Sequence, residues 1–442
     1  MPPVAFSSLP FDHSAKRTEV RLELREALAD ARRTTDALFA LLTAEGLSAR
    51  PIAERHRFIF YLGHLEAFDW NLVCRDVLGR PSSNEEFERL FAFGIDPLDG
   101  NLPRDTPTDW PRIATILAWT RRARADVDAA VDRAPFERLL EDGWALRIAV
   151  EHRLMHAETL CYLLQRLDIA FKRPGPLPDP RPTGAAGGTV VVPRGRTTLG
   201  LSRAAAPYRG WDNEYERHAV DVDGFAIARL PVSNADWLRF VAADGYRARE
   251  LWDADAWAWL SREDISAPAF WRRTGDRIEW QGMFGRVPLP MDWPVYVSHA
   301  EATAYARWKR GRLPTEAEWH RATFGEHPAD APFVGNFGLQ RFEPTASGAH
   351  PGAVGPWGVT DLVGNGWEWT STVFAPFDGF EPLPFYRGYS ANFFDGRHFV
   401  LKGASPSTHA TFLRPSFRNW FQPHYQHVFA KFRLVTEEGI DG

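Results

Sequence analysis

The pattern of hydrophobic and polar positions divides the chain into two parts of different texture. In the first part, up to residue 170, apolar residues recur every three or four positions, which is the period of an amphipathic helix. The helices predicted in this way cover residues 15–45, 51–79, 109–133 and 135–168. Four long amphipathic helices joined by short connections predict an antiparallel four-helix bundle.

The second part lacks long helical periodicity and alternates short strands, tryptophan-rich loops and a few short helices. One such helix is expected to begin at Glu316, because Thr315 and Glu318 form a capping box. This alternation predicts an α+β domain rather than a doubly wound sheet. We therefore predict a helical domain over 1–171 and an α+β domain over 190–442. Between them, residues 172–189 are a proline- and glycine-rich linker.

Length, charge and cysteine content narrow the class of protein. A chain of 442 residues favours at least two domains. Its net charge of −5 gives no basic footprint for nucleic acid or for an anionic membrane, so small molecules are the expected partners. Two cysteines allow no disulfide framework, and no signal peptide or long apolar run is found. We expect a cytoplasmic protein.

Two histidines interrupt the apolar stripe of the last predicted helix. Residues 149–164 read AVEHRLMHAETLCYLL, and His152 and His156 lie four positions apart on the face that continues through Leu160 and Leu163. Such a pair can present two imidazole nitrogens to one metal ion. It also fits histidines that are satisfied in a core or on a surface, so a metal site needs a third ligand.

His64 is the candidate for the third ligand. It lies in FYLGHLEAFDWNL, on the stripe that Tyr61, Phe68 and Leu72 form along the second predicted helix. Antiparallel helices bring such inward groups together, and a buried imidazole without a partner costs about 1–3 kcal/mol. Three histidines that face one core therefore favour a shared ion.

Carboxylates near these histidines do not fit the same ligand set. Glu158 is two residues beyond His156, about 200° around the helix, and Glu66 is related to His64 in the same way. The predicted site therefore has three neutral histidines and open positions for other ligands. Imidazole suits iron, copper and zinc, and the spacing does not select among them.

Several motifs together resemble one known family. In chain order they are GHLEAFDWNL, EHRLMHAETL, GRLPTEAEW, DLVGNGWEWTS, SFRNWFQPH and FAKFRLV. Their order and spacing resemble the EgtB-like family of ergothioneine-type sulfoxide synthases, nonheme iron enzymes. Members of this family join a DinB-like helical bundle to a formylglycine-generating-enzyme-like α+β domain. The resemblance implies Fe(II) held by His64, His152 and His156, and an O2-dependent reaction that attaches sulfur to the imidazole C2 of hercynine, the trimethylated betaine of histidine.

The resemblance also implies residues that handle the substrate. Asn419 and Trp420, in FRNW, match positions that contact hercynine, and an aromatic face suits a quaternary ammonium through cation–π attraction. FYRGYS matches the tyrosine loop of the family, which makes Tyr386 the candidate catalytic tyrosine and Tyr389 a substrate-lining one. The alternative is that both are loop tyrosines packed on the domain surface.

Two further motifs are interpreted as structural. In GNGWEWT we expect Gly364 and Gly366 to allow tight turns, while Trp367 and Trp369 fill the core of the α+β domain. RLPTEAEW likewise identifies the fold, and no chemistry is assigned to either motif.

The chain departs from the family at the donor site. Members that use γ-glutamylcysteine resemble one another in an acid directly after FRNW, an arginine four residues further and an arginine pair in the loop after the second helix. Here Phe421 and Tyr425 occupy the first two places, and the loop offers only Arg104. Rings and the absence of charge fit a neutral donor. With FAFGIDP and RNWFQPHY, this resembles the selenoneine synthase branch, whose members form a carbon–selenium bond between hercynine and a selenosugar, and we predict this reaction. The alternative is ergothioneine synthesis from cysteine or γ-glutamylcysteine.

Met155 is a second departure, since the family often has glutamine before the second histidine, where it can hydrogen-bond the substrate imidazole. Either another group orients hercynine, or a soft side chain beside the chalcogen is preferred.

Two other classes of protein fit part of the pattern. One is a DinB-like zinc enzyme that transfers a low-molecular-weight thiol and uses the same three histidines. The other is a non-catalytic binding module. Formylglycine generation is not expected, because the second part of the chain has no cysteine pair.

Overall fold

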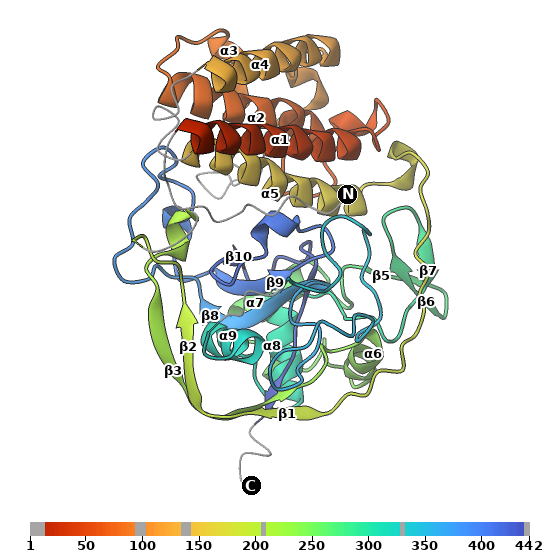
Figure 1. Ribbon diagram of the computed structural model, residues 1–442. Coiled ribbons are helices and arrows are strands. Elements are labelled where there is room, and N and C mark those ends of the chain that lie inside the picture. Colours follow the sequence, from red (N-terminus) through yellow and green to blue (C-terminus); the bar gives the residue numbers. More distant parts are fainter. Residues whose placement is uncertain (1–13, 93–102, 134–142, 205–208, 328–331, 437–442) are drawn as a thin grey trace. The chain divides into compact units, whose positions relative to one another are not determined.

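The computed structural model describes residues 14–92, 103–133, 143–204, 209–327 and 332–436. The chain forms two compact units, Met1–Pro176 and Leu177–Gly442. Each unit has its own arrangement of elements, shown in Figure 1.

The first unit is a bundle of helices. They are α1 (Ser14–Phe39), α2 (Phe58–Trp70), α3 (Glu85–Leu90), α4 (Ile113–Arg133) and α5 (Trp144–Arg166), and the π-helix η2 (Asn71–Val77) continues α2. Helix α1 packs against α5, and α2 packs against both α4 and α5. Arg25 pairs with Asp132 and Arg32 pairs with Asp128. Because the later residue of α1 pairs with the earlier residue of α4, these two helices are antiparallel. The predicted four-helix bundle is confirmed.

The helix ends differ from the sequence prediction. Helix α1 ends at Phe39 rather than at 45 because the chain turns to pair with the end of the unit, where Thr43 N donates to Phe171 O at 3.0 Å. Helix α2 begins at Phe58 rather than at 51, after an extended Arg57. Residues 135–142 of the fourth predicted helix lie outside the described residues, as do residues 93–97 of FAFGIDP.

Helix α3 was not predicted. Its N-cap is Asn84, whose side chain accepts a hydrogen bond from Phe87 N at 3.0 Å. The element has only 6 residues, too few to show helical periodicity.

Over its described residues, the second unit combines four small sheets with four short α-helices. The strands are β1 (Thr189–Val192), β2 (Gly195–Leu199), β3 (His218–Val222), β4 (Phe225–Ala228), β5 (Trp271–Thr274), β6 (Arg277–Gln281), β7 (Arg286–Pro288), β8 (Gly366–Val373), β9 (Phe399–Ala404), β10 (Asn419–Phe421), β11 (Ala430–Lys431) and β12 (Val435–Thr436). The helices are α6 (Asn234–Ala242), α7 (Ala254–Arg262), α8 (His299–Trp308) and α9 (Glu316–Phe324). The sheet orders are β1-β4-β12, β10-β9-β8-β11, β2-β3 and β5-β6-β7. This is the α+β architecture that the sequence predicts.

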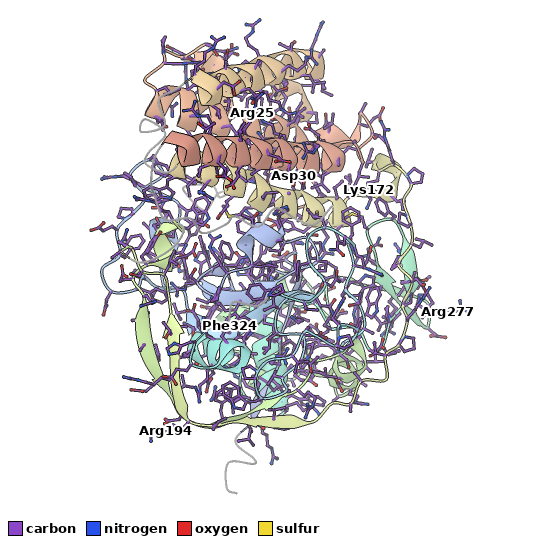
Figure 2. The ribbon with its side chains drawn as sticks, viewed as in Figure 1. Arg25, Asp30, Lys172, Arg194, Arg277 and Phe324 are labelled. Atoms are coloured by element: carbon purple, nitrogen blue, oxygen red, sulfur yellow. The ribbon has the colours of Figure 1, made fainter. Side chains whose placement is uncertain are left out.

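Helix α9 and the β1-β4-β12 sheet share one hydrophobic core. Trp319 and Ala322 of α9 pack against Val192 and Ile227 of this sheet, and Phe324 lies at the edge of the cluster. In Figure 2, Arg194, in the turn between β1 and β2, and Arg277, in β6, extend outward, whereas Phe324 lies among other side chains. The predicted capping box is present, with Thr315 as N-cap, so α9 begins at Glu316 as expected.

The glycines of GNGWEWT have the predicted role. Gly364 has a φ of 88° and Gly366 a φ of 128°, which disfavour any residue with a side chain. A Cβ on Gly366 would lie 2.8 Å from the ring of Tyr296. Trp367 and Trp369 are 1% and 0% exposed, so both fill the core as predicted.

Residues 173–188 contain neither helix nor strand. Part of this stretch is tethered to the second unit, because Thr183 N donates to Asp292 Oδ2 at 3.1 Å and Thr183 Oγ1 donates to Ser347 O at 2.7 Å. Within the described ranges, none of the helices combines the length and the apolar composition that crossing a bilayer requires.

Candidate functional site

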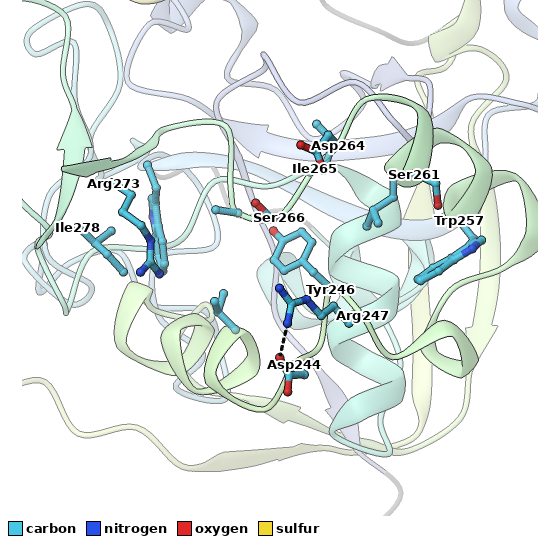
Figure 3. Close-up of a pocket in the computed structure, with 14 residues that line it drawn as sticks. Asp244, Tyr246, Arg247, Trp257, Ser261, Asp264, Ile265, Ser266, Arg273 and Ile278 are labelled. Carbon is cyan, nitrogen blue, oxygen red and sulfur yellow. Dashed lines mark ion pairs between the residues drawn. The ribbon is translucent and has the colours of Figure 1, made fainter. Parts of the chain in front are cut away.

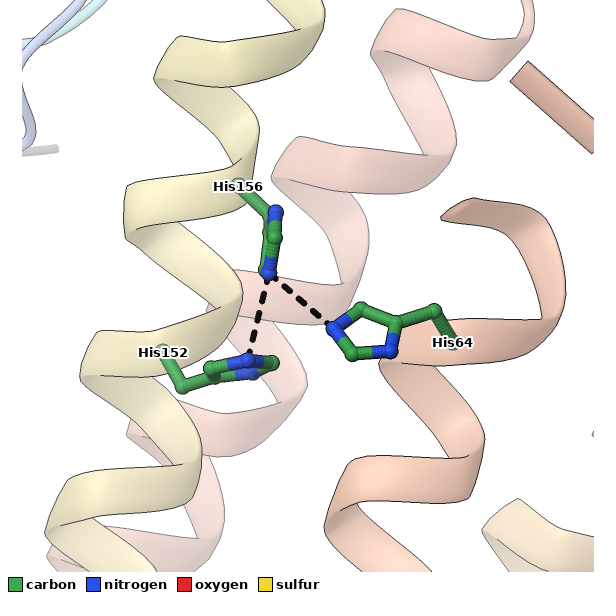
Figure 4. Close-up of side chains that lie close together, drawn as sticks. All are labelled: His64, His152 and His156. Atoms are coloured by element: carbon green, nitrogen blue, oxygen red, sulfur yellow. Dashed lines mark hydrogen bonds between the residues drawn. The ribbon is translucent and has the colours of Figure 1, made fainter. Parts of the chain in front are cut away.

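Three histidines converge inside the helical unit. His64 from α2 and His152 and His156 from α5 are all buried, and their candidate ligand atoms lie within 4.8 Å of one another. The Nε2 atom of His156 is 3.2 Å from Nε2 of His64 and 3.2 Å from Nε2 of His152 (Figure 4). The three Nε2 atoms therefore point toward one small volume between the two helices.

The backbone orients the ring of His64. Its Nδ1 donates to the carbonyl oxygen of Phe91 at 2.7 Å, which leaves the Nε2 lone pair directed toward the other two histidines. Phe91 comes this close because the residue before His64 is a glycine. A Cβ on Gly63 would lie 2.4 Å from the Phe91 ring.

Aromatic rings enclose the histidines. Phe68 stacks on His152 with ring centroids 3.5 Å apart, Phe60 stacks on His64 at 4.8 Å, and the ring of Tyr61 lies 5.6 Å from that of His156. Burial lowers the pKa of His64 to about 4 and holds the pKa of His152 and of His156 well below the usual value. All three imidazoles are therefore neutral at physiological pH, which is the form that binds metal ions.

The donor set fits a divalent transition metal. For metal–nitrogen bonds of about 2.0–2.1 Å, neighbouring ligand nitrogens lie roughly 2.8–3.4 Å apart, from octahedral angles at the short end to tetrahedral angles at the long end. The two separations of 3.2 Å fall in that range. Three ligands on one side leave further coordination positions open.

The nearby acid Glu66 takes part in a different interaction. It forms an ion pair with Arg153 at 3.0 Å, and Arg153 also reaches Asp69 at 2.6 Å. These three charged side chains are at most 2% exposed. Since Arg153 lies on α5 and both acids lie on α2, the cluster joins the two helices that carry the histidines. The sequence reasoning excluded Glu66 as a ligand but did not find this cluster.

Met155 and Glu158, on α5, are both half-buried. The carbonyl oxygen of Met155 accepts a hydrogen bond from Thr159 Oγ1 at 3.3 Å.

In the second unit, the two candidate tyrosines belong to one aromatic cluster. The ring centroids of Tyr386 and Tyr389 are 5.8 Å apart, Tyr389 stacks on Trp211 at 3.9 Å, and Trp420 meets Tyr389 edge-on at 5.3 Å. Trp420 in turn stacks on Phe374 at 4.2 Å. Tyr389 is buried and Tyr386 is half-buried.

The other candidate substrate residues divide between the two faces of β10. Because side chains alternate along a strand, Trp420 points to one face, and Asn419 and Phe421 point to the other. Phe421 stacks on Tyr425 with centroids 5.1 Å apart and an angle of 3° between the rings. The structure thus brings Trp420 together with the tyrosines and Phe421 together with Tyr425.

A buried ion pair fixes the residue that precedes this strand. Arg418 donates to both carboxylate oxygens of Glu316, from Nε at 3.0 Å and from Nη2 at 3.1 Å. Glu316 is the first residue of α9, in the motif RLPTEAEW. The sequence analysis assigned that motif to the fold alone. The signal it offered was a second acid beside the capping Glu318.

Near the loop after α2, two arginines are engaged in ion pairs and a third is exposed. Arg104 is exposed. Arg50 and Arg57 both pair with Asp105 and also donate to backbone carbonyls, Arg50 to Pro103 O and Arg57 to Ser48 O.

A separate cavity of about 820 Å³ lies in the second unit between α6, α7 and the β5-β6 hairpin (Figure 3). Tyr246, Leu260 and Trp271 contribute its apolar lining, and Arg247 forms an ion pair with Asp244 at its edge at 3.8 Å. Its lining includes none of the candidate residues predicted from the sequence.

Comparison with known proteins agrees with this two-part structure. The DinB superfamily model matches residues 27–160, and the model of the sulfatase-modifying factor enzyme 1-like domain matches residues 175–438. The protein thus combines a DinB-type helical bundle and a sulfatase-modifying-factor-type α+β domain in one polypeptide.

Three relatives share most of this chain. A hercynine oxygenase of Mycolicibacterium thermoresistibile is 39% identical over 76% of this chain and 78% of its own length. A hercynine oxygenase of Mycolicibacterium smegmatis is 34% identical over 76% of this chain and 80% of its own length. Ergothioneine biosynthesis protein 1 of Neurospora crassa is 26% identical over 90% of this chain but only 56% of its own length. The chain belongs to the hercynine oxygenase family, the EgtB-like family to which its motifs point.

Proposed function

We propose that this protein is an O2-dependent nonheme Fe(II) enzyme that forms a carbon–chalcogen bond at the imidazole C2 of hercynine. The observation that carries the proposal is the buried His64, His152 and His156 triad, whose Nε2 atoms converge in the domain that DinB-type relatives share. The names of the relatives supply hercynine as the substrate.

The roles of the residues follow from their chemistry. The three neutral imidazoles would hold Fe(II), which when bound supplies adjacent positions for O2 and for the chalcogen donor. Trp420 and its aromatic neighbours suit a trimethylammonium group, which cannot donate hydrogen bonds and is attracted to ring faces. Tyr386, half-buried at the edge of that cluster, is the candidate proton donor.

The relatives favour a thiol donor such as cysteine or γ-glutamylcysteine, because two are named for hercynine oxygenation and one for ergothioneine biosynthesis. A specific observation favours a second candidate, a selenosugar. Phe421 and Tyr425 form a parallel stack where thiol-using members carry charges. A neutral aromatic surface suits a sugar better than an amino-acid terminus.

A competition experiment tests both the reaction and its donor. The Fe(II)-loaded enzyme is incubated with hercynine, O2 and an equimolar mixture of selenosugar, cysteine and γ-glutamylcysteine, and the products are identified by mass. Any C2-substituted hercynine supports the reaction, and the dominant adduct identifies the donor. A protein that retains only zinc and consumes no O2 would instead support a DinB-like thiol transferase.

A variant pair connects turnover to the triad. His152→Ala should abolish turnover and Fe(II) retention, whereas His327→Ala, an exposed histidine of the second unit, should leave both unchanged. Turnover that survives in His152→Ala would contradict the assignment of the metal site.

A further inference from the structure

Four consecutive residues, Trp211–Glu214, are almost completely buried although three of them are polar. Their exposed fractions are 0% for Trp211, 1% for Asp212, 1% for Asn213 and 0% for Glu214. Burying polar and charged side chains is costly unless hydrogen bonds compensate. The partners of this segment therefore indicate what it holds in place.

The first two residues contact the tyrosine loop. Trp211 stacks on Tyr389 at 3.9 Å. Asp212 Oδ1 accepts a hydrogen bond from Ser390 Oγ at 2.5 Å, and Asp212 Oδ2 accepts one from Leu383 N at 3.5 Å. Because Leu383 and Ser390 lie on either side of Tyr386 and Tyr389, one carboxylate holds both ends of the stretch that carries the tyrosines.

The last two residues contact the segment that leads into β10. The carbonyl oxygen of Asn213 accepts from Arg418 Nη1 at 3.3 Å. Glu214 accepts from Arg414 Nη2 at 2.6 Å and from Ser416 Oγ at 2.6 Å. One short segment thus anchors both the tyrosine loop and the approach to Asn419 and Trp420.

The tyrosine loop depends on such anchors because no helix or strand supplies it with regular backbone hydrogen bonds. Residues 374–390 contain neither helix nor strand. At the start of this stretch Arg418 Nη1 donates to Ala375 O at 3.0 Å. The ion pair between Glu381 and Arg203 is 3.9 Å long, and the Glu381 side chain is 77% exposed, so solvent weakens it. The bonds to Asp212 are buried, and a hydrogen bond to an ionised acceptor is stronger than a neutral one.

We propose that Asp212 is a positioning residue that fixes the conformation of the loop bearing Tyr386 and Tyr389 through Ser390 and Leu383. Its importance for turnover rests on the function proposed above, whereas its effect on the loop does not. Asp212 is distinct from the residues that touch hercynine or iron in that proposal.

Local proteolysis tests the effect on the loop. Arg387 is exposed inside the loop, and Arg277 is exposed in a hairpin of the same unit, so trypsin cleavage at Arg277 serves as the internal reference. In Asp212→Asn the acceptor loses its negative charge, so the bonds to Ser390 and Leu383 are no longer charge-assisted and hold the loop less tightly. We expect cleavage after Arg387 to become at least tenfold faster, with cleavage after Arg277 unchanged.

Two further variants control this result. Ser390→Ala removes only the partner hydroxyl and should also accelerate cleavage after Arg387, and the double variant should add little because both changes act on the same bond. Asp378→Asn, an exposed acid of the same loop, should match the wild type. Cleavage after Arg387 within twofold of wild type in both Asp212→Asn and Ser390→Ala would overturn the proposal.

Kinetics then separates the two proposals. If both are correct, Asp212→Asn lowers kcat at least tenfold while Fe(II) affinity and the melting temperature of the helical unit stay at wild-type values. A loop that becomes trypsin-sensitive in a protein without hercynine turnover would keep the positioning role and reject the proposed function. A trypsin-sensitive loop with unchanged kcat would show that the loop is not needed for turnover, and would overturn the catalytic importance of Asp212.

Discussion

At the scale of single residues, the aromatic pair Phe421 and Tyr425 at the proposed donor site distinguishes this chain from the thiol-using members of its family. Phe421 is half-buried and Tyr425 is 7% exposed, and the two rings lie parallel. Family members that use γ-glutamylcysteine resemble one another in charges at both positions. The difference is therefore a replacement of an ionic pair by a stacked apolar pair.

Restoring the charges should change the donor preference. We expect Phe421→Asp combined with Tyr425→Arg to raise the ratio of γ-glutamylcysteine adduct to selenosugar adduct by about tenfold or more, since each charge-assisted hydrogen bond contributes about 1.5–3 kcal/mol. Both changes are made together because a lone buried charge is costly. The measurement is the competition assay read by product mass.

Phe421→Leu with Tyr425→Phe is the matched control, because it changes shape without adding charge. An unchanged product ratio in the charged double variant would mean that other residues select the donor.

The histidines of the candidate site could be found from the sequence, whereas their supporting contacts could not. His152 and His156 are one helical turn apart, and His64 lies on an inward stripe, so periodicity alone brings them to a common core. Asp212 and Ser390 are 178 residues apart in the chain, and their hydrogen bond has no local signal. The same holds for Glu316 and Arg418, which pair although they are 102 residues apart in the chain.

At the scale of elements, the Glu66–Arg153–Asp69 cluster fixes α2 against α5. The ion pairs of Arg153 cross from one ligand-bearing helix to the other, and all three groups are at most 2% exposed. Arg153 also donates to the carbonyl oxygen of Leu65, the residue after His64, at 3.1 Å. The relative position of the two helices therefore depends on this guanidinium.

Arg153→Met should lower stability by about 3–5 kcal/mol, because Asp69 is left buried without the cation that pairs with it and Glu66 keeps only Arg124. We also expect weaker Fe(II) binding, measured by anaerobic titration, because α2 is no longer held in register with α5. The triple variant Glu66→Gln, Asp69→Asn, Arg153→Met removes the buried charge and should recover most of the stability without recovering the affinity.

Arg33→Met, on the exposed side of α1, should change neither quantity. If Arg153→Met were destabilised but bound Fe(II) with wild-type affinity, the cluster would have no role in placing the histidines.

The helices themselves were predictable, but their ends were not. Periodicity identifies the amphipathic segments, yet α1 stops at Phe39 because its continuation pairs with residues near 171, a tertiary contact. The strand order is equally non-local. Strand β4 lies between β1 and β12, and Val435 pairs with Ile227 from more than 200 positions away.

At the scale of the whole molecule, the change in hydrophobic periodicity along the chain predicts two units, and each unit has its own buried core. The histidine triad lies in the helical unit, whereas most of the 18 tryptophans belong to the second unit. Far-UV circular dichroism therefore reports mainly on the helical unit, and tryptophan fluorescence mainly on the second unit, which holds 14 of the 18 tryptophans.

Metal should stabilise one unit selectively. A ligand that binds only the folded form, at a free concentration 1,000 times its Kd, adds about 4 kcal/mol to the free energy of unfolding. We expect anaerobic Fe(II) to raise the melting temperature seen by circular dichroism and to leave the tryptophan transition unchanged. His152→Ala should abolish the rise. An equal shift of both transitions would show that the two units unfold together.

The hydrogen bond from His64 to Phe91 is accepted by a main-chain oxygen, and this limits which substitutions can disturb the ring of His64. A side-chain acceptor can be deleted by one codon change, but a carbonyl is present whatever residue occupies position 91. The orientation of His64 is therefore insulated from most substitutions at its own partner. The sensitive position is Gly63, the residue next to the ligand, because a Cβ there would overlap the ring of Phe91.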